Sequence, residues 1–160
     1  MLIAVLASVF IASCYDGDTC SANRGLDLFA ADLSNANLSG LNLRDTDLTS
    51  ADLSFANLSY VDLSNAYLRN TDLSHADLSF ADLSGADMSK GYVELFRADL
   101  SNANLMDANL SNANLTGTVL AGTNLYDTNL TDAIWGNTIC PDGTMNSGTS
   151  PCTAEQLNLV

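Results

Sequence analysis

Ser74 and His75, with Asp72 and Asp77 close by, are the residues whose types could form a catalytic centre. A hydrolase triad needs a serine, a histidine and a carboxylate whose side chains converge on one point. Here Ser74 and His75 follow one another directly, and serine and aspartate recur at the same spacing along much of the chain. The pattern therefore predicts a scaffold, and we expect no catalytic residue and no cofactor.

Two short acidic motifs raise the question of metal binding. Asp16-Gly17-Asp18 and Asp142-Gly143 look like fragments of a calcium-binding loop. Neither motif continues with the ligand pattern of an EF-hand. The sequence therefore predicts no metal site.

Ser74 and its neighbours belong to a five-residue repeat that runs from Leu26 to Asp132. Leucine occupies the third position of every unit except one, where Met88 stands, and the first position is usually Ala or Thr. One polar residue separates the small residue from the leucine, so both lie on the same side of an extended segment. Each unit can therefore bury two side chains.

A period of five excludes the two simplest regular structures. In an α-helix, at roughly 100° per residue, the leucines would spread around the whole circumference. A straight strand would lose its apolar face after one unit, because two polar residues follow each leucine. The chain must turn at every unit and coil into a solenoid, in which stacking supplies the core.

These A-[DN]-L-x-x units resemble those of the pentapeptide repeat family, with 13 units up to Lys90 and 8 units from Val93. The resemblance implies an all-β fold, a right-handed quadrilateral β-helix with four units per coil. Leucine then points inward from each face and Ala or Thr lines the corners. On that plan the units wind about five coils, a rod roughly 25 Å tall at the ~4.8 Å spacing of neighbouring strands.

With four units per coil, residues twenty apart lie on top of one another. Phe55 precedes His75 by twenty residues, and Tyr60 precedes Phe80 by the same number. We therefore expect two ladders of stacked rings. Other echoes, such as A-D-L-S-F-A at Ala51 and Ala76, are out of this phase.

The repeat is interrupted once, by Gly91-Tyr92, which shifts every later leucine by two positions. Such an insertion fits a bulge at a corner, where glycine tolerates unusual backbone angles. In one interpretation it forms a loop with Tyr92, Phe96 and Arg97 as anchors for a partner. In the other, which we prefer, it is a tolerated surface insertion of low energetic cost.

Residues 1–13 are expected to form a signal peptide or lipoprotein signal. Within them Met1 to Ala12 is apolar apart from Ser8, too short to span a bilayer and of the length of a signal-peptide core. The run lacks a preceding Lys or Arg and ends in Ile11-Ala12-Ser13-Cys14, which resembles the lipobox of bacterial lipoproteins. Cys14 is therefore a lipidation candidate; with simple secretion, which we favour, it can pair with Cys20. Residues 14–25 form an N-terminal cap segment in both cases. The expected location is secreted, periplasmic or envelope-attached, with membrane contact only through a lipid on Cys14.

Residues 133–160 are expected to cap the C-terminal end of the solenoid. The segment N-T-x-C-P-D-G-T, followed by a second cysteine, resembles the ending of many secreted members of the family. On this resemblance we expect a Cys140–Cys152 disulfide that closes a short loop over the rod.

The chain has 19 acidic and 5 basic residues, a formal charge of −14, so nucleic acid is a poor partner. On four faces, Asp32, Asp52, Asp72 and Glu94 fall into one column of carboxylates. The equivalent positions later in the chain are neutral: Asn104, Asn109, Asn114, Asn124 and Asn129. Acidity at this position of the unit is thus concentrated in the first half of the repeat.

These features predict a monomeric, non-enzymatic structural or protein-interaction module of the cell envelope or extracellular space, with an unidentified protein partner. The alternative is an acidic rod that imitates DNA and binds a DNA-binding protein such as DNA gyrase, as some members of the family do. Fifteen acidic less four basic residues leave −11 in the repeat. Over the rod that is about one charge per 2.3 Å, near the one per ~1.7 Å of duplex DNA. A third hypothesis, ice or mineral binding, rests on the column Ser39, Ser59, Ser79 and Ser101.

Overall fold

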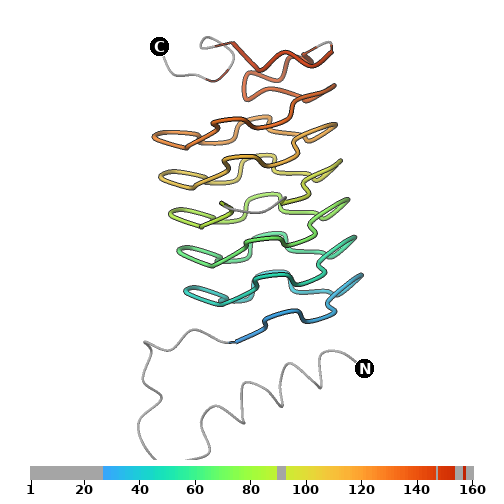
Figure 1. The fold of residues 1–160 in the computed structure, drawn as a ribbon, viewed down its shortest axis with the longest axis vertical. Helices are drawn as coiled ribbons and strands as arrows, with labels where there is room; N and C mark the ends of the chain where they lie inside the picture. Colours follow the sequence, from blue (N-terminus) through green and yellow to red (C-terminus); the bar gives the residue numbers. More distant parts are fainter. Residues whose placement is uncertain (1–26, 90–92, 147, 154–156, 158–160) are drawn as a thin grey trace, which may run out of the picture.

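The computed structural model describes residues 27–89, 93–146, 148–153 and 157. Over these residues the chain winds into coils stacked along one axis, from the N-terminal to the C-terminal end (Figure 1). The predicted signal segment 1–13, the cap segment 14–25 with Cys14 and Cys20, and the insertion Gly91-Tyr92 lie outside the described residues. Those three stay predictions.

A tight turn at the end of each unit explains the five-residue period. The leucine carbonyl accepts a hydrogen bond from the N–H three residues later, as from Ala36 to Leu33 (3.1 Å) and from Ala51 to Leu48 (3.0 Å). Two residues lie between the leucine and this N–H, and the second of them has a positive φ, 57° at Asn35 for example. This is the left-handed third position of a type II turn, which favours Gly, Asn and Asp.

Parallel bridges join each coil to the next. They pair residues twenty apart, such as Asp32 with Asp52 and Asp52 with Asp72. Beyond the insertion the pairing continues with Asp72 and Glu94, twenty-two apart. Each bridge is a single residue pair, with no longer strand in the described part of the chain, and the residue that follows donates to the next coil, as Leu33 N–H does to Asp52 O (2.8 Å). The twenty-residue register and its shift by two are as predicted from the sequence.

The core consists of the leucines and small residues of the repeat. Leu48, Leu53, Leu58 and Leu63 are fully buried, and the alanines at the first position of the middle units are buried beside them. Where threonine replaces alanine it keeps a partner: Thr71 Oγ1 donates to the carbonyl oxygen of Leu48 at 2.9 Å. A buried hydroxyl without such a bond would destabilise the fold.

The C-terminal end is closed by a different arrangement. Trp135 occupies a leucine position and is buried. The predicted Cys140–Cys152 disulfide is present, and Met145 pairs antiparallel with Ile139. In the described part of the chain, no helix is long and apolar enough to cross a membrane.

Candidate interaction surface

An aspartate or asparagine before the leucine accepts a hydrogen bond from the backbone of the turn. Asp52 Oδ1 accepts from the N–H of Ser54 at 2.9 Å, and Asn57 Oδ1 accepts from the N–H of Ser59 at 3.1 Å. Aspartate and asparagine therefore accept the same hydrogen bond from the backbone. Since both residues make this bond, and the turns after Leu68 and Leu120 form with Tyr67 and Val119 in this position, the turn does not require the charge of an aspartate.

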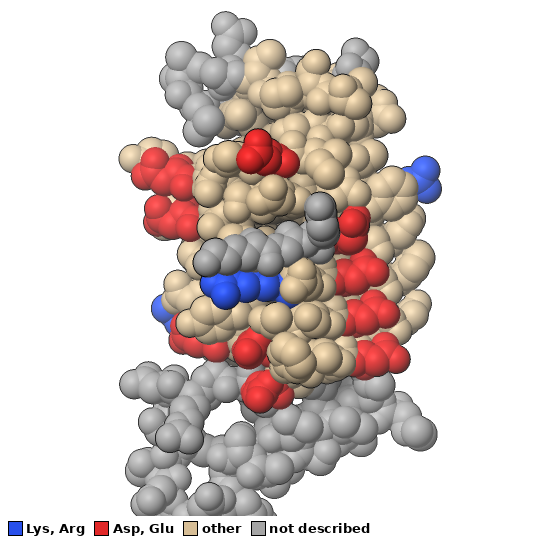
Figure 2. Space-filling model, viewed as in Figure 1, with Lys and Arg blue, Asp and Glu red and all other residues tan. Residues whose placement is uncertain are grey.

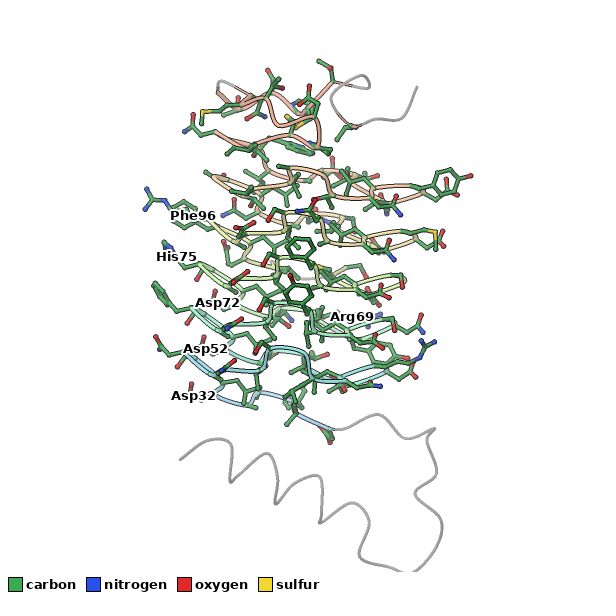
Figure 3. The ribbon with its side chains drawn as sticks, turned by 180° about the vertical axis from the view of Figure 1, so that it is seen from behind. Asp32, Asp52, Arg69, Asp72, His75 and Phe96 are labelled. Atoms are coloured by element: carbon green, nitrogen blue, oxygen red, sulfur yellow. A yellow bond between two sulfur atoms is a disulfide. The ribbon has the colours of Figure 1, made fainter. Side chains whose placement is uncertain are left out.

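Carboxylates occupy consecutive rungs of one face. Asp32, Asp52, Asp72 and Glu94 are joined by successive bridges, and Figure 3 shows the three aspartates one above another. Neighbouring carboxylates lie about one strand spacing apart, ~4.8 Å, and repel one another unless counterions screen them. Hydrogen bonds from the hydroxyl and the N–H of Ser34 lower the pKa of Asp32, so this end of the column is ionised at neutral pH.

Later in the chain the same position forms ladders of amides. Asn124 Nδ2 donates to Asn104 Oδ1 at 3.0 Å, and Asn129 Nδ2 donates to Asn109 Oδ1 at 3.1 Å. An amide carries both donors and acceptors, so a column of asparagines can bond from rung to rung. Ionised carboxylates only accept, so a column of aspartates cannot. Acidic side chains form a column over the coils toward the N-terminal end (Figure 2).

Among the described residues, Asp87 is the carboxylate with the closer of two ion pairs; the other joins Arg44 and Asp45 at 3.5 Å. Arg69 Nε donates to Asp87 Oδ2 at 3.0 Å, and a second guanidinium nitrogen of Arg69 donates to the same oxygen. Partial burial of Asp87 raises its pKa, but the hydrogen bonds from Arg69 and Ser89 outweigh this effect and hold the pKa of Asp87 below its ordinary value. Sequence reasoning missed this pair, which joins residues eighteen apart across a rung.

Two ladders of stacked rings lie at neighbouring corners, as predicted. The rings of Phe55 and His75 are 4.6 Å apart and those of Tyr60 and Phe80 are 4.9 Å apart, each pair within 2° of parallel. Phe55, Tyr60 and Phe80 are 58%, 64% and 49% exposed. The rings thus lie largely in solvent.

These rings occupy an unfavourable backbone conformation. All four residues have φ between 58° and 61°. For a bulky L-residue this left-handed conformation costs about 1–2 kcal/mol relative to the right-handed one. Stacking stabilises a pair of rings by roughly 0.5–1.5 kcal/mol, so it offsets only part of the strain. Asparagine or glycine would avoid the strain at the same corners.

Phe96 and Arg97 extend the first ladder. The Phe96 ring meets His75 edge-on, with centroids 5.6 Å apart, and the Arg97 guanidinium carbon lies 5.1 Å from the Phe96 centroid. The twenty-two-residue register pairs His75 with Arg97, so sequence alignment alone could not reveal the contact with Phe96. The predicted anchor Tyr92 lies outside the described residues.

The aromatic corners and the carboxylates lie on three successive sides of two consecutive coils. We call this region the acidic–aromatic surface and define it as the outward side chains of residues 52–62 and 72–82. Along the first coil the order is Asp52, Phe55, Tyr60 and Asp62, with the neutral Asn57 between the two rings. The next coil has Asp72, His75, Asp77, Phe80 and Asp82, with a carboxylate in the place of Asn57, and neither segment contains Lys or Arg.

The residues first considered for catalysis or metal binding do not converge. Asp72 Oδ1 accepts from the backbone N–H of Ser74 at 2.9 Å, and His75 stacks on Phe55. Asp142 Oδ1 bonds the N–H and hydroxyl of Thr144. Among the described residues no group of three or more His, Cys, Asp or Glu could hold a metal ion.

Comparison with solved structures finds this chain similar to several pentapeptide repeat proteins and to a resistance protein. A pentapeptide repeat protein (Rfr23) from the cyanobacterium Cyanothece 51142 is 30% identical, with a TM-score of 0.68 over 83% of this chain and 97% of that chain. HetL, a pentapeptide repeat protein involved in heterocyst differentiation regulation from Nostoc sp. strain PCC 7120, is 35% identical, with a TM-score of 0.38 over 77% and 65%. QnrB1, a plasmid-mediated fluoroquinolone resistance protein, is 17% identical, with a TM-score of 0.47 over 81% and 83%.

The sequence itself carries the family's repeat. It matches the family model for pentapeptide repeats, with 8 copies, over residues 27–65, 51–89 and 94–134. A search of curated proteins found no match. Members of this family fold as right-handed quadrilateral β-helices. The match over more than half of the chain, together with the likeness to Rfr23, shows that this chain belongs to the pentapeptide repeat family.

Proposed function

We propose that this chain is a non-enzymatic protein-interaction module that acts outside the cytoplasm, in the secreted, periplasmic or envelope-attached space. One observation carries the proposal: the outer positions hold charges and exposed rings that the turns do not require. Asp52 and Asn57 complete their turns in the same way, yet only one carries a charge. The scaffold is a right-handed quadrilateral β-helix of about five coils, in which stacking supplies the core and leaves the outer side chains free to vary.

The proposed location rests on the cysteines and on the first residues of the sequence. Cys140 and Cys152 form a disulfide, a bond that persists mainly in oxidising compartments. The apolar run of residues 1–13 has the length of an export signal. Mass spectrometry of the mature N-terminus tests this part, because cleavage, lipidation of Cys14 or an intact Met1 each give a different mass.

Photo-crosslinking tests the interaction. A photoreactive phenylalanine analogue is placed, one variant at a time, one residue after the leucine on each of four successive sides. The positions are Ser34, Ser39, Arg44 and Thr49. In cells that naturally express the protein, we expect one discrete crosslinked protein from one or two adjacent sides. If no position yields a discrete product, the chain is not an interaction module.

The acidic rod also supports a second candidate, imitation of DNA toward a DNA-binding protein such as gyrase. The observation that favours it is the column of carboxylates at Asp32, Asp52, Asp72 and Glu94. The amide ladders later in the chain and the pairing of Asp87 with Arg69 count against it, because they leave much of the rod without free charge. An intact Met1 together with altered supercoiling in a gyrase assay would favour this candidate over the first.

A further inference from the structure

The acidic–aromatic surface identifies the chemistry of a partner, in an inference that rests on the proposed protein-interaction function. We propose that this surface binds an arginine-rich segment of a partner protein. Its carboxylates would pair with the guanidinium groups, and its aromatic corners would pack against the arginine stems.

The aromatic corners are the first support, because the fold does not need rings there. Elsewhere the same turn position is filled mostly by residues that tolerate positive φ, with Ala30, Ser50 and Arg97 as exceptions. The tolerant residues include Asn35, Gly40, Asn65, Gly85, Asn102, Gly117 and Gly122. Phe55, Tyr60, His75 and Phe80 replace such residues on two neighbouring corners of the same two coils. All four are strained there; Phe55, Tyr60 and Phe80 are exposed and His75 is half-buried. Strain kept at an exposed position points to a role outside the fold.

Charge complementarity is the second support. Segments 52–62 and 72–82 carry five aspartates and no Lys or Arg. The nearest described arginine in sequence, Arg69, already bonds Asp87. Among the described residues no Lys or Arg forms an ion pair with these aspartates, although Asp82 accepts a hydrogen bond from Asn104 (3.1 Å), so the surface offers negative charge beside apolar rings. A guanidinium fits both, because it binds carboxylates through two donors and packs flat against aromatic groups.

The chain's own arginines show both contacts. Arg97 lies over the Phe96 ring, 5.1 Å from its centroid, and Phe96 meets the Phe55–His75 ladder at its end. Arg69 donates two hydrogen bonds to Asp87. The partner would repeat these two contacts side by side. Because stacked rings cover one another's inner faces, an arginine stem would pack against the ring edges while its head reaches a carboxylate.

Peptide titrations with the full chain test the proposal. The probes are two ten-residue peptides of equal charge, one alternating arginine with alanine and the other alternating lysine with alanine, and spermine as a small polycation. At about 50 mM salt we expect the arginine peptide to bind about tenfold more tightly than the lysine peptide, since a guanidinium pairs with a carboxylate through two hydrogen bonds whereas an ammonium acts as a point charge.

Three variants separate the contributions. F55N/Y60N/F80N removes rings without changing charge, and Asn suits the positive φ of these corners. D52N/D72N removes charge but keeps the turn acceptors. Y67N/Y126N removes two exposed rings outside the surface and serves as the matched control. We expect each of the first two variants to weaken binding of the arginine peptide about tenfold and the control to bind as wild type.

The proposal is overturned if the ring-deleted variant binds as wild type, if both peptides or spermine bind equally well, or if no probe binds. Circular dichroism and thermal unfolding establish that each variant is folded before titration. The photo-crosslinking experiment distinguishes failure of this arginine-binding proposal from failure of the proposed function. A partner captured from Thr49 alone would keep the interaction module but move its contact away from the acidic–aromatic surface.

Discussion

The coils before and after the insertion share one backbone and differ in what they display. In residues 27–89 the position before the leucine is mostly aspartate, and in residues 93–135 it is mostly asparagine. The turn bond is the same in both parts: Asp52 Oδ1 accepts from Ser54 N–H at 2.9 Å and Asn114 Oδ1 from Thr116 N–H at 3.1 Å. The fold therefore accommodates either residue at this position and does not decide whether it carries a charge.

The two parts also differ in how the outer positions affect stability. The later coils bond rung to rung through amides, as from Asn124 to Asn104, and are followed by the Cys140–Cys152 disulfide. The earlier coils stack carboxylates and place rings at positive φ. Both features lower stability, as functional surfaces commonly do. We therefore expect the first half to be the less stable half at low ionic strength.

Core truncation should show the largest effect and no difference between the halves. Leu63→Ala and Leu115→Ala each remove a fully buried side chain from a comparable position. Each should lower the free energy of unfolding by about 2–5 kcal/mol, because the core cannot close the cavity. Urea denaturation followed by circular dichroism measures both. If one variant lost less than half as much free energy of unfolding as the other, the two halves would differ in core packing as well as in surface.

The disulfide should contribute the next largest effect, confined to the C-terminal part. Cys140 and Cys152 are 12 residues apart, and a loop of this size predicts at most about 3 kcal/mol. The double variant C140S/C152S should lose hydrogen-exchange protection at Thr138, whose N–H donates to Asn146 Oδ1 at 2.8 Å. Protection at Leu53, in the first half, serves as the internal control. Equal loss at both sites would mean that the cap stabilises the whole rod.

The sequence predicts the parts of this comparison that depend on register alone. A five-residue period with buried leucine requires a turn at each unit, and a spacing of twenty places Phe55 on His75. Register also places the carboxylate column correctly.

Contacts that cross the register were not predictable in the same way. Phe96 reaches His75 from the neighbouring turn position, and Arg69 reaches Asp87 diagonally across a rung. Both contacts depend on the length and rotamer of a side chain, which a repeat pattern does not encode. The signal that could have found the ion pair is its place in the unit, an arginine just after one leucine position and an aspartate just before the equivalent position one coil later.

Exchanging the outer residues tests the comparison directly. D52N/D72N should stabilise the first half by roughly 0.2–1 kcal/mol at low salt, because repulsion ends while the turn acceptors remain. The reverse exchange N104D/N124D should destabilise the later half. It breaks the hydrogen bonds from Asn124 to Asn104 (3.0 Å) and from Asn104 to Asp82 (3.1 Å), and it sets three carboxylates in one column. Thermal unfolding with and without 1 M NaCl measures both. A change of melting temperature that salt does not reduce would assign the difference to packing.

The Arg69–Asp87 pair should give the smallest effect and a dependence on pH. Hydrogen bonds from Arg69 contribute to holding the pKa of Asp87 below its ordinary value of 3.8. A carboxyl whose pKa is lower in the folded state stabilises the fold above its unfolded pKa, and this stabilisation is lost as pH falls through the folded pKa. R69M should therefore lower the melting temperature slightly near pH 7, and the difference from wild type should shrink as pH falls below 3.8.

R44M, which removes a more exposed pair at 3.5 Å, is the control and should change the melting temperature less. A difference that is constant across pH would show that Arg69 acts through the packing of its stem, and that no carboxylate of the first half gains stability from a charged partner in this way.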